Sequence, residues 1–244
     1  MPLSTTPSAS ADLSSLPVIV VTGMAFEARI ARGEGVEVVY AARADLLERA
    51  LNAAIARGCS GIVSFGTAGG LAPDLEPGSL IVANAVEGPF GRQETDRQWA
   101  DRLVAAMMAG PLAGRLQRGL MAAVAAPLVS ADDKRALHRS SGALAVDMES
   151  HIAGATAAAH SVPFAVCRAI VDPAWRTLPS AATAGLRDDG STALGPILRE
   201  LLRQPSQLGG LIQVAVDARA ARTSLVEARR AMGDAGALRI AAVV

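Results

Sequence analysis

Short hydrophobic runs rich in β-branched residues alternate with longer segments of helical periodicity along most of the chain. Residues 18–22, VIVVT, and residues 36–40, VEVVY, favour strands because valine, isoleucine and threonine are common in sheets. In residues 44–57, apolar side chains recur at the spacing of one helix face. Such alternation is typical of parallel strands joined by helical crossovers, so we expect an α/β sandwich with a mainly parallel sheet.

The alternation continues through the rest of the chain. Further strands are expected at residues 61–65, 79–86, 120–124, 143–147 and 163–171. Further helices are expected at residues 24–31, 97–108, 134–141, 149–160, 182–202 and 208–232. In open α/β sheets ligands bind at the carboxyl ends of the strands, so the residues just after each strand are the candidates for a binding site.

Length and charge narrow the class of protein. A chain of 244 residues favours a single domain, which we expect at 17–244 with a helical C-terminal extension from about residue 205. With 23 basic and 23 acidic residues, it lacks the basic excess of a nucleic-acid-binding protein. Residues 1–16 resemble a flexible leader rather than a signal peptide, and no apolar run is long enough to span a bilayer, so we expect a cytoplasmic protein.

A glycine-rich segment, SFGTAGG at residues 64–70, follows one of the apolar runs. Small residues in such a segment let backbone N–H groups approach an anion closely. The spacing matches neither the dinucleotide-binding nor the Walker A pattern. We therefore expect a loop that binds a small anion, with a tight turn that binds nothing as the alternative.

Three carboxylates, Glu27, Glu149 and Asp172, each follow an expected strand closely. Cleavage of a glycosidic bond needs one group to protonate the departing base and another to hold the sugar while positive charge develops on it. Taken singly, each carboxylate has the alternative of capping a helix or lying in a solvated loop. The chain's three histidines show no metal-binding spacing, so no metal site is expected.

Segments at these positions resemble the superfamily of purine nucleoside phosphorylases and methylthioadenosine/adenosylhomocysteine nucleosidases. They are GMAFE at 23–27, GTAGGLAP at 66–73 with PGSLIV at 77–82, and AVDMES at 145–150 followed by RAIVD at 168–172. The resemblance covers residues 17–175. It implies a three-layer sandwich around a central mixed, mainly parallel sheet, and a homodimer or higher homo-oligomer.

The resemblance also implies roles for individual residues. Asp172 would help to protonate N7 of the leaving purine, and Glu149 would bind the ribose hydroxyls with Met148 beneath the sugar. Glu27 would handle the nucleophilic water, as in the nucleosidases. The groups implied to bind phosphate or that water are Gly23, Gly66, Thr67 and Ala68.

A narrower resemblance is to the hopanoid-associated phosphorylases of bacteria. It rests on the Asp172–Pro173 step, on LPSA at 178–181 and on the tail from 207 to 219. It implies release of adenine from adenosylhopane, with inorganic phosphate as co-substrate and no other cofactor. The alternatives are an ordinary purine nucleoside as substrate, a methylthioadenosine/adenosylhomocysteine-type nucleosidase that uses water, and a non-catalytic nucleoside-binding protein.

The sequence departs from the nucleosidases at two places. Lys134 stands where methylthioadenosine nucleosidases have a phenylalanine near the base, and YAAR at 40–43 replaces a glycine-rich or Ser-Gly loop. The second departure removes a recognisable part of the anion site.

The expected C-terminal helix has an apolar stripe followed by arginines. The stripe consists of Leu208, Leu211, Ile212 and Ala215, and the arginines are Arg219, Arg222 and Arg229. We expect this face to pack on the domain core or on a partner subunit. The alternative is peripheral contact with a bilayer surface, which would suit a lipid-linked nucleoside.

Overall fold

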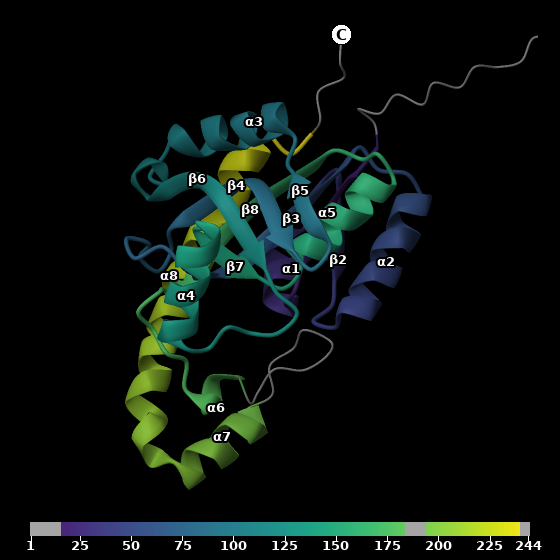
Figure 1. Ribbon diagram of the computed structural model, residues 1–244. Coiled ribbons are helices and arrows are strands. Elements are labelled where there is room, and N and C mark those ends of the chain that lie inside the picture. Colours follow the sequence, from purple (N-terminus) through teal and green to yellow (C-terminus); the bar gives the residue numbers. More distant parts are fainter. Residues whose placement is uncertain (1–15, 184–193, 240–244) are drawn as a thin grey trace, which may run out of the picture.

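The computed structural model describes residues 16–183 and 194–239, and these residues form a sheet with helices on both faces (Figure 1). The strands are β1 (Val18–Thr22), β2 (Val36–Tyr40), β3 (Gly61–Gly70), β4 (Leu80–Gly88), β5 (Gly91–Glu94), β6 (Leu116–Ala123), β7 (Ala145–Asp147) and β8 (Phe164–Asp172). Within the described residues they make one eight-stranded sheet in the order β2-β1-β3-β7-β6-β4-β5, with β8 paired to both β3 and β4.

The sheet is mixed but mainly parallel, as predicted. Strand β1 pairs in parallel with β2 and β3, β3 with β8, and β6 with both β4 and β7. Antiparallel pairing joins β3 to β7, and β4 to both β5 and β8. The parallel strands β1, β3 and β8 end at one edge, so the residues that follow β1 and β8 lie near the end of β3.

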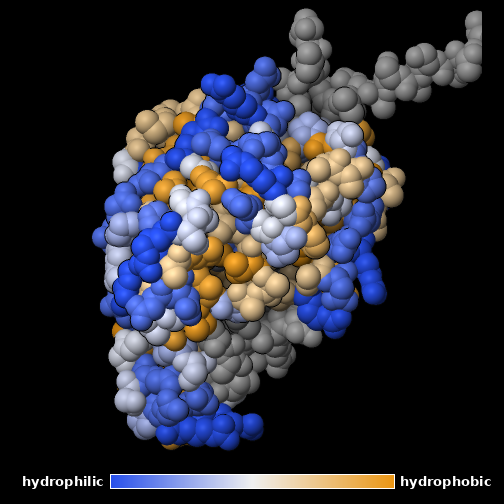
Figure 2. All heavy atoms as spheres, viewed as in Figure 1, coloured by the Kyte–Doolittle hydropathy of each residue, from blue (hydrophilic) through white to orange (hydrophobic). Residues whose placement is uncertain are grey.

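Helices cover the sheet on both sides and complete the three layers. They are α1 (Ala25–Ala31), α2 (Ala44–Ala56), α3 (Arg97–Met108), α4 (Ala131–Ser141), α5 (Ser150–Ala159), α6 (Ser180–Thr183), α7 (Leu194–Arg203) and α8 (Leu208–Asp234). Alternate residues of β1 point into two apolar clusters, because side chains in a strand alternate between its faces. One cluster contains α2 and α5 side chains, and the other contains those of α3 and α8. The face seen in Figure 2 shows apolar surface near its centre and polar residues around it.

The structure corrects some of the expected elements. The glycine-rich residues 66–70 are part of β3 and not a loop, because they continue the ladder to β8 and end against β7. The short strand β5 was not predicted, since its sequence GRQE has no apolar alternation. Helix α4 begins at Ala131, where Ser130 caps its first amides with its hydroxyl, and not at residue 134.

Helix α8 is exposed at its start and buried further along. Leu208 and Ile212 of the predicted stripe are exposed, whereas Ala221 and Leu225 belong to the apolar cluster beneath α3. Leu208 and Ile212 therefore do not pack on this chain's own core, and their packing on a partner subunit stays a prediction. None of the helices in the described ranges is both long and apolar enough to cross a membrane. The expected leader lies, except for Leu16, outside the described residues.

The contribution of the core can be tested with two leucines of α2. Leu51 is fully buried and Leu46 is 40% exposed on the same helix. Leu51→Ala should lower the free energy of unfolding by about 2–5 kcal/mol, because it leaves a cavity in the core. Leu46→Ala changes the same residue type at the surface and should cost less than about 1 kcal/mol. Urea denaturation followed by circular dichroism measures both; equal losses would contradict this assignment of the core.

Candidate active site

Glu27 lies at the carboxyl end of the sheet, in the first turn of α1. It is 1% exposed, and its carboxylate accepts four hydrogen bonds. Oε2 accepts from the amides of Gly23 and Met24 at 3.2 and 3.1 Å, and Oε1 accepts from the amide and hydroxyl of Thr67, both at 2.7 Å. Glu27 thus joins the end of β1 to the glycine-rich part of β3.

Arg168, in the middle of β8, is the buried cation of this site. Its Nε lies 2.8 Å from Asp147 Oδ2, and its Nη2 lies 3.2 Å from Glu149 Oε2. The same guanidinium donates to the Ser64 hydroxyl at 2.6 Å and to the Thr67 carbonyl at 3.3 Å. It therefore links β3, β7 and the start of α5 through charge-assisted contacts.

Glu149 lies two residues after the end of β7, at the N-cap position of α5, and its side chain lies against Gly23. A Cβ at Gly23 would be 2.3 Å from Glu149 Oε1, so only glycine permits this close approach. Burial raises the pKa of Glu149 to about 7; the Arg168 guanidinium opposes this shift, and the carboxylates of Asp147 and Glu27 add to it. Glu149 therefore changes charge near neutral pH.

Gly66 makes room for two of these groups. A Cβ there would be 2.7 Å from both Arg168 Nη1 and Glu27 Cδ. The Arg168 guanidinium and the Glu27 carboxylate thus both lie close to Gly66. This close contact explains why the segment contains glycine although it forms a strand.

Asp172 ends β8 and is held by a lysine. Its Oδ2 accepts a hydrogen bond from Lys134 Nζ, and its Oδ1 and Oδ2 would be 3.3 and 3.4 Å from a Cβ at Gly69. Burial raises the pKa of Asp172, while the Lys134 ammonium opposes the shift. Asp172 therefore lies next to the glycine-rich part of β3. Its ionic partner is Lys134, whereas the ionic partner of Glu149 is Arg168.

Met148 and Glu149 line a small cavity of about 70 Å³ together with Ala42 and His151. His151 is buried in the first turn of α5, and its ring stacks at a tilt on Phe90, with ring centroids 5.3 Å apart. Its burial lowers its pKa, although Asp147 opposes this effect. Glu149 therefore borders an open space next to the start of α5.

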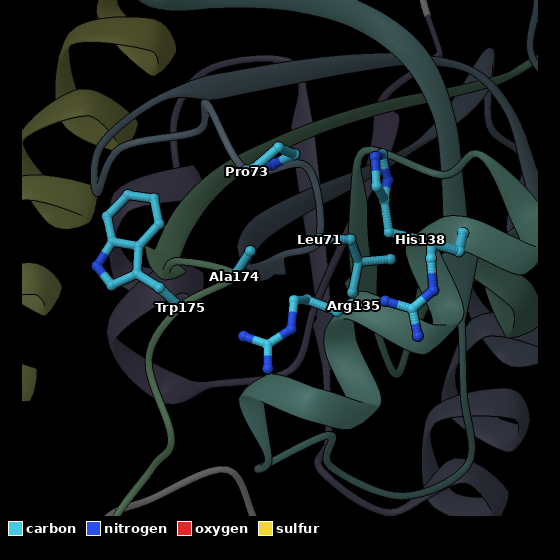
Figure 3. Close-up of a pocket in the computed structure, with 7 residues that line it drawn as sticks. Leu71, Pro73, Arg135, His138, Ala174 and Trp175 are labelled. Carbon is cyan, nitrogen blue, oxygen red and sulfur yellow. The ribbon is translucent and has the colours of Figure 1, made fainter.

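A larger cavity of about 310 Å³ lies beside the segment that follows Asp172 (Figure 3). Leu71 and Pro73 come from the turn after β3, and Ala174 and Trp175 come from the segment after β8. The basic residues on its wall all come from α4 and are Arg135, His138 and Arg139. The exposed surface of the wall is mostly apolar, as is usual for a small-molecule site.

The structure brings the predicted site residues together in two groups. Glu27, Gly23, Gly66, Thr67 and Glu149 surround Arg168, and Met148 lines the adjoining cavity. The second group is at Asp172, which ends β8 and lies next to Gly69 of β3. Ala68, the residue before Gly69, is buried in β3.

Sequence reasoning assigned no role to Arg168, Asp147 and Ser64. One signal was present, because a charged residue inside the apolar run FAVCRAIVD requires a buried partner. Which residues supply that partner depends on strand pairing, which the sequence alone does not give.

Comparison with known proteins places the chain in a family. The model of the phosphorylase superfamily matches residues 13–203. Because that match covers most of the 244 residues, the chain belongs to the phosphorylase superfamily. No curated protein matches the sequence significantly.

Solved structures with the same fold include nucleosidases. A 5′-methylthioadenosine/S-adenosyl homocysteine nucleosidase from Helicobacter pylori has a TM-score of 0.63 at 15% identity, covering 91% of this chain and 98% of that one. A putative methylthioadenosine nucleosidase from Weissella paramesenteroides has a TM-score of 0.58 at 18% identity, covering 88% and 98%. A futalosine hydrolase mutant from Helicobacter pylori has a TM-score of 0.57 at 18% identity, covering 64% and 88%. At these identities the likeness establishes the fold.

The role of the buried cation can be tested by removing its charge. Arg168→Met leaves Asp147 and Glu149 without their cation and should lower the free energy of unfolding by about 3–5 kcal/mol at neutral pH. Arg92 pairs with Glu94 at the surface, and Arg92→Met should leave the free energy of unfolding unchanged within error. Guanidinium denaturation compares the two variants; equal stability of Arg168→Met and wild type would contradict the proposed dependence on Arg168.

Proposed function

We propose that this protein hydrolyses the N-glycosidic bond of a purine nucleoside, with Glu27, Glu149 and Asp172 in the active site. The observation that carries the choice of water as nucleophile is the position of Glu27. Its carboxylate already accepts hydrogen bonds from the amides of Gly23 and Met24 and from the amide and hydroxyl of Thr67. These donors include groups that a phosphate-binding site would need.

The local charge favours the same choice. Around Arg168 stand the carboxylates of Glu27, Asp147 and Glu149, so acidic groups outnumber the cation. A phosphate anion entering beside Glu27 would meet like charges and would compete for donors that are already used. A neutral water molecule meets neither obstacle.

Each carboxylate has a distinct task in the proposed reaction. The Thr67 hydroxyl can rotate away from Glu27 Oε1, which frees that oxygen to accept a proton from the attacking water. Glu149, when ionised, holds the ribose hydroxyls and stabilises the positive charge that develops on the sugar. Asp172 gives a proton to N7 of the purine as the bond from C1′ to N9 breaks.

The substrate class rests on the relatives. A further structure of the Helicobacter pylori nucleosidase, a mutant with a TM-score of 0.62 at 16% identity, holds 5′-methylthioadenosine in its active site. We propose an adenine nucleoside substrate of this kind for the present chain. Phosphorolysis of adenosylhopane is the second candidate, supported by the segments at 172–173, 178–181 and 207–219.

Base release distinguishes these reactions. We would incubate the protein with adenosine, 5′-methylthioadenosine, S-adenosylhomocysteine or adenosylhopane, with and without phosphate, and separate the products by chromatography. We expect adenine and free sugar at the same rate in both buffers. Phosphate-dependent release with a sugar phosphate would establish the phosphorylase instead, and no release from any substrate would overturn the proposed function.

Asp172 provides the first mutational test. Asp172→Asn keeps the shape of the side chain but carries no acidic proton, so kcat should fall by at least about 100-fold. Asp133→Asn changes an exposed carboxylate of α4 in the same way and should retain wild-type kcat. If Asp172→Asn kept its turnover, the role of Asp172 as the acid would be wrong.

Glu149 predicts a pH dependence. With a pKa of about 7, Glu149 becomes protonated as the pH falls and then no longer balances positive charge on the sugar. The wild-type kcat/KM should therefore decline below about pH 7. Because one group titrates, the limiting slope should be about tenfold per pH unit. Glu149→Gln should lower kcat/KM by about 100-fold or more and lose this acid limb. If Glu149→Gln showed the same decline of kcat/KM at low pH as wild type, the titration of another group would be its cause.

A further inference from the structure

Lys134 is the only lysine of the chain, and it is fully buried. It lies in the first turn of α4, where it is the one buried residue of that helix. Lysine is among the residues least often buried, because its ammonium loses hydration unless other groups replace the water. The position therefore needs partners, and the structure provides three acceptors.

Those acceptors all come from the end of β8 and the segment after it. Nζ donates to Asp172 Oδ2, to the Pro173 carbonyl at 3.2 Å and to the Arg176 carbonyl at 3.0 Å. An ammonium has three N–H donors, so each donor has one acceptor. All three N–H donors of Lys134 are therefore used, and these hydrogen bonds fix Nζ on one side of the Asp172 carboxyl group.

The contact distinguishes the two oxygens of Asp172. Oδ2 accepts the hydrogen bond from Lys134, whereas Oδ1 accepts none from the described residues. Both oxygens lie beside Gly69, at 3.3 and 3.4 Å from a Cβ placed there. The Asp172 side chain is 11% exposed, so little water is available to solvate a charge on it. A carboxylate formed there by loss of a proton would be costly without a cation beside it.

We propose that Lys134 is the positioning residue of Asp172: it holds Oδ2 and leaves Oδ1 for the base, and its ammonium neutralises the carboxylate formed when Asp172 protonates the leaving purine. This inference rests on the proposed function. In the step, the electrons of the C1′–N9 bond pass to the purine, N7 takes the proton from Oδ1, and Lys134 keeps all its protons. The acid is regenerated from solvent after the products leave.

The two other charged groups that act on the Asp172 carboxyl group, Arg176 and Asp217, pair with each other. Arg176, from the segment after β8, contacts Asp217 of α8 through Nε at 3.0 Å and Nη2 at 2.9 Å. Asp217 also accepts from Gln213 at 3.1 Å. Among these groups, Lys134 is thus the cation in direct contact with Asp172.

The test compares Lys134→Met with Lys134→Arg in the full chain. Lys134→Met removes the charge but keeps an unbranched side chain, and kcat should fall by about 100-fold with little change in KM. Without the cation the pKa of Asp172 rises further, so the basic limb of the pH–kcat profile should move to higher pH. Lys134→Arg retains a cation and should recover a substantial part of kcat with a limb near that of wild type.

Two outcomes overturn the inference while the proposed function stands. In one, wild type is active and Lys134→Met has the same kcat and pH profile. In the other, both variants lose activity equally and the limb does not move, which is the result of a merely structural role. If wild type itself releases no base, the proposed function fails and this inference fails with it.

A second measurement applies even if Lys134→Met does not fold. Lysine labelled with ¹³C at Cε gives one resonance, because the chain has one lysine. At pH 7 this resonance should shift in Asp172→Asn relative to wild type, whereas Asp133→Asn should leave it in place. An identical resonance in wild type and Asp172→Asn would show that Lys134 does not sense Asp172, which refutes the inference.

Discussion

The pairing of one buried guanidinium with several acidic groups underlies the arrangement of the candidate site. Arg168 contacts Ser64 and Thr67 of β3, Asp147 of β7 and Glu149 before α5. A cation in the middle of a sheet is tolerated only when such partners replace its hydration, so the strands must keep their register for the charge to remain satisfied. The side chain that stabilises the centre of the fold therefore also orients Glu149.

The site divides into two regions, and each has its own buried cation. At one end, Arg168 serves Asp147 and Glu149, which the sugar would meet under the proposed mechanism. At the other end, Lys134 serves Asp172, which the purine would meet. Glycosidic cleavage separates charge in the same way, with positive charge on the sugar and negative charge on the base. Two carboxylates with separate cationic partners, Glu149 with Arg168 and Asp172 with Lys134, suit such a reaction better than two carboxylates that share one cation.

Much of the fold could be predicted from local sequence, because runs such as VIVVT and the apolar spacing in 44–57 reflect which side chains a strand or helix can bury. The glycine-rich segment is a strand and not the expected loop. Its Gly66 is needed because Arg168 of β8 and Glu27 of α1 approach it closely, and the local sequence does not reveal these neighbours. Contacts such as Lys134 with Asp172, 38 residues apart, depend on tertiary structure and leave no periodic signal. Positions of acidic residues after strands were predictable, but their partners were not.

Helix α8 forms an ion pair with the segment that follows Asp172. Asp217 anchors Arg176, whose carbonyl accepts a hydrogen bond from Lys134, while Leu225 fills the core further along the same helix. The C-terminal helix is thus not a detachable appendage, even though Leu208 and Ile212 at its start are exposed. The Asp217–Arg176 pair joins α8 to the segment beside Asp172. The position of α8 therefore bears on the carbonyl group that holds Lys134 beside Asp172.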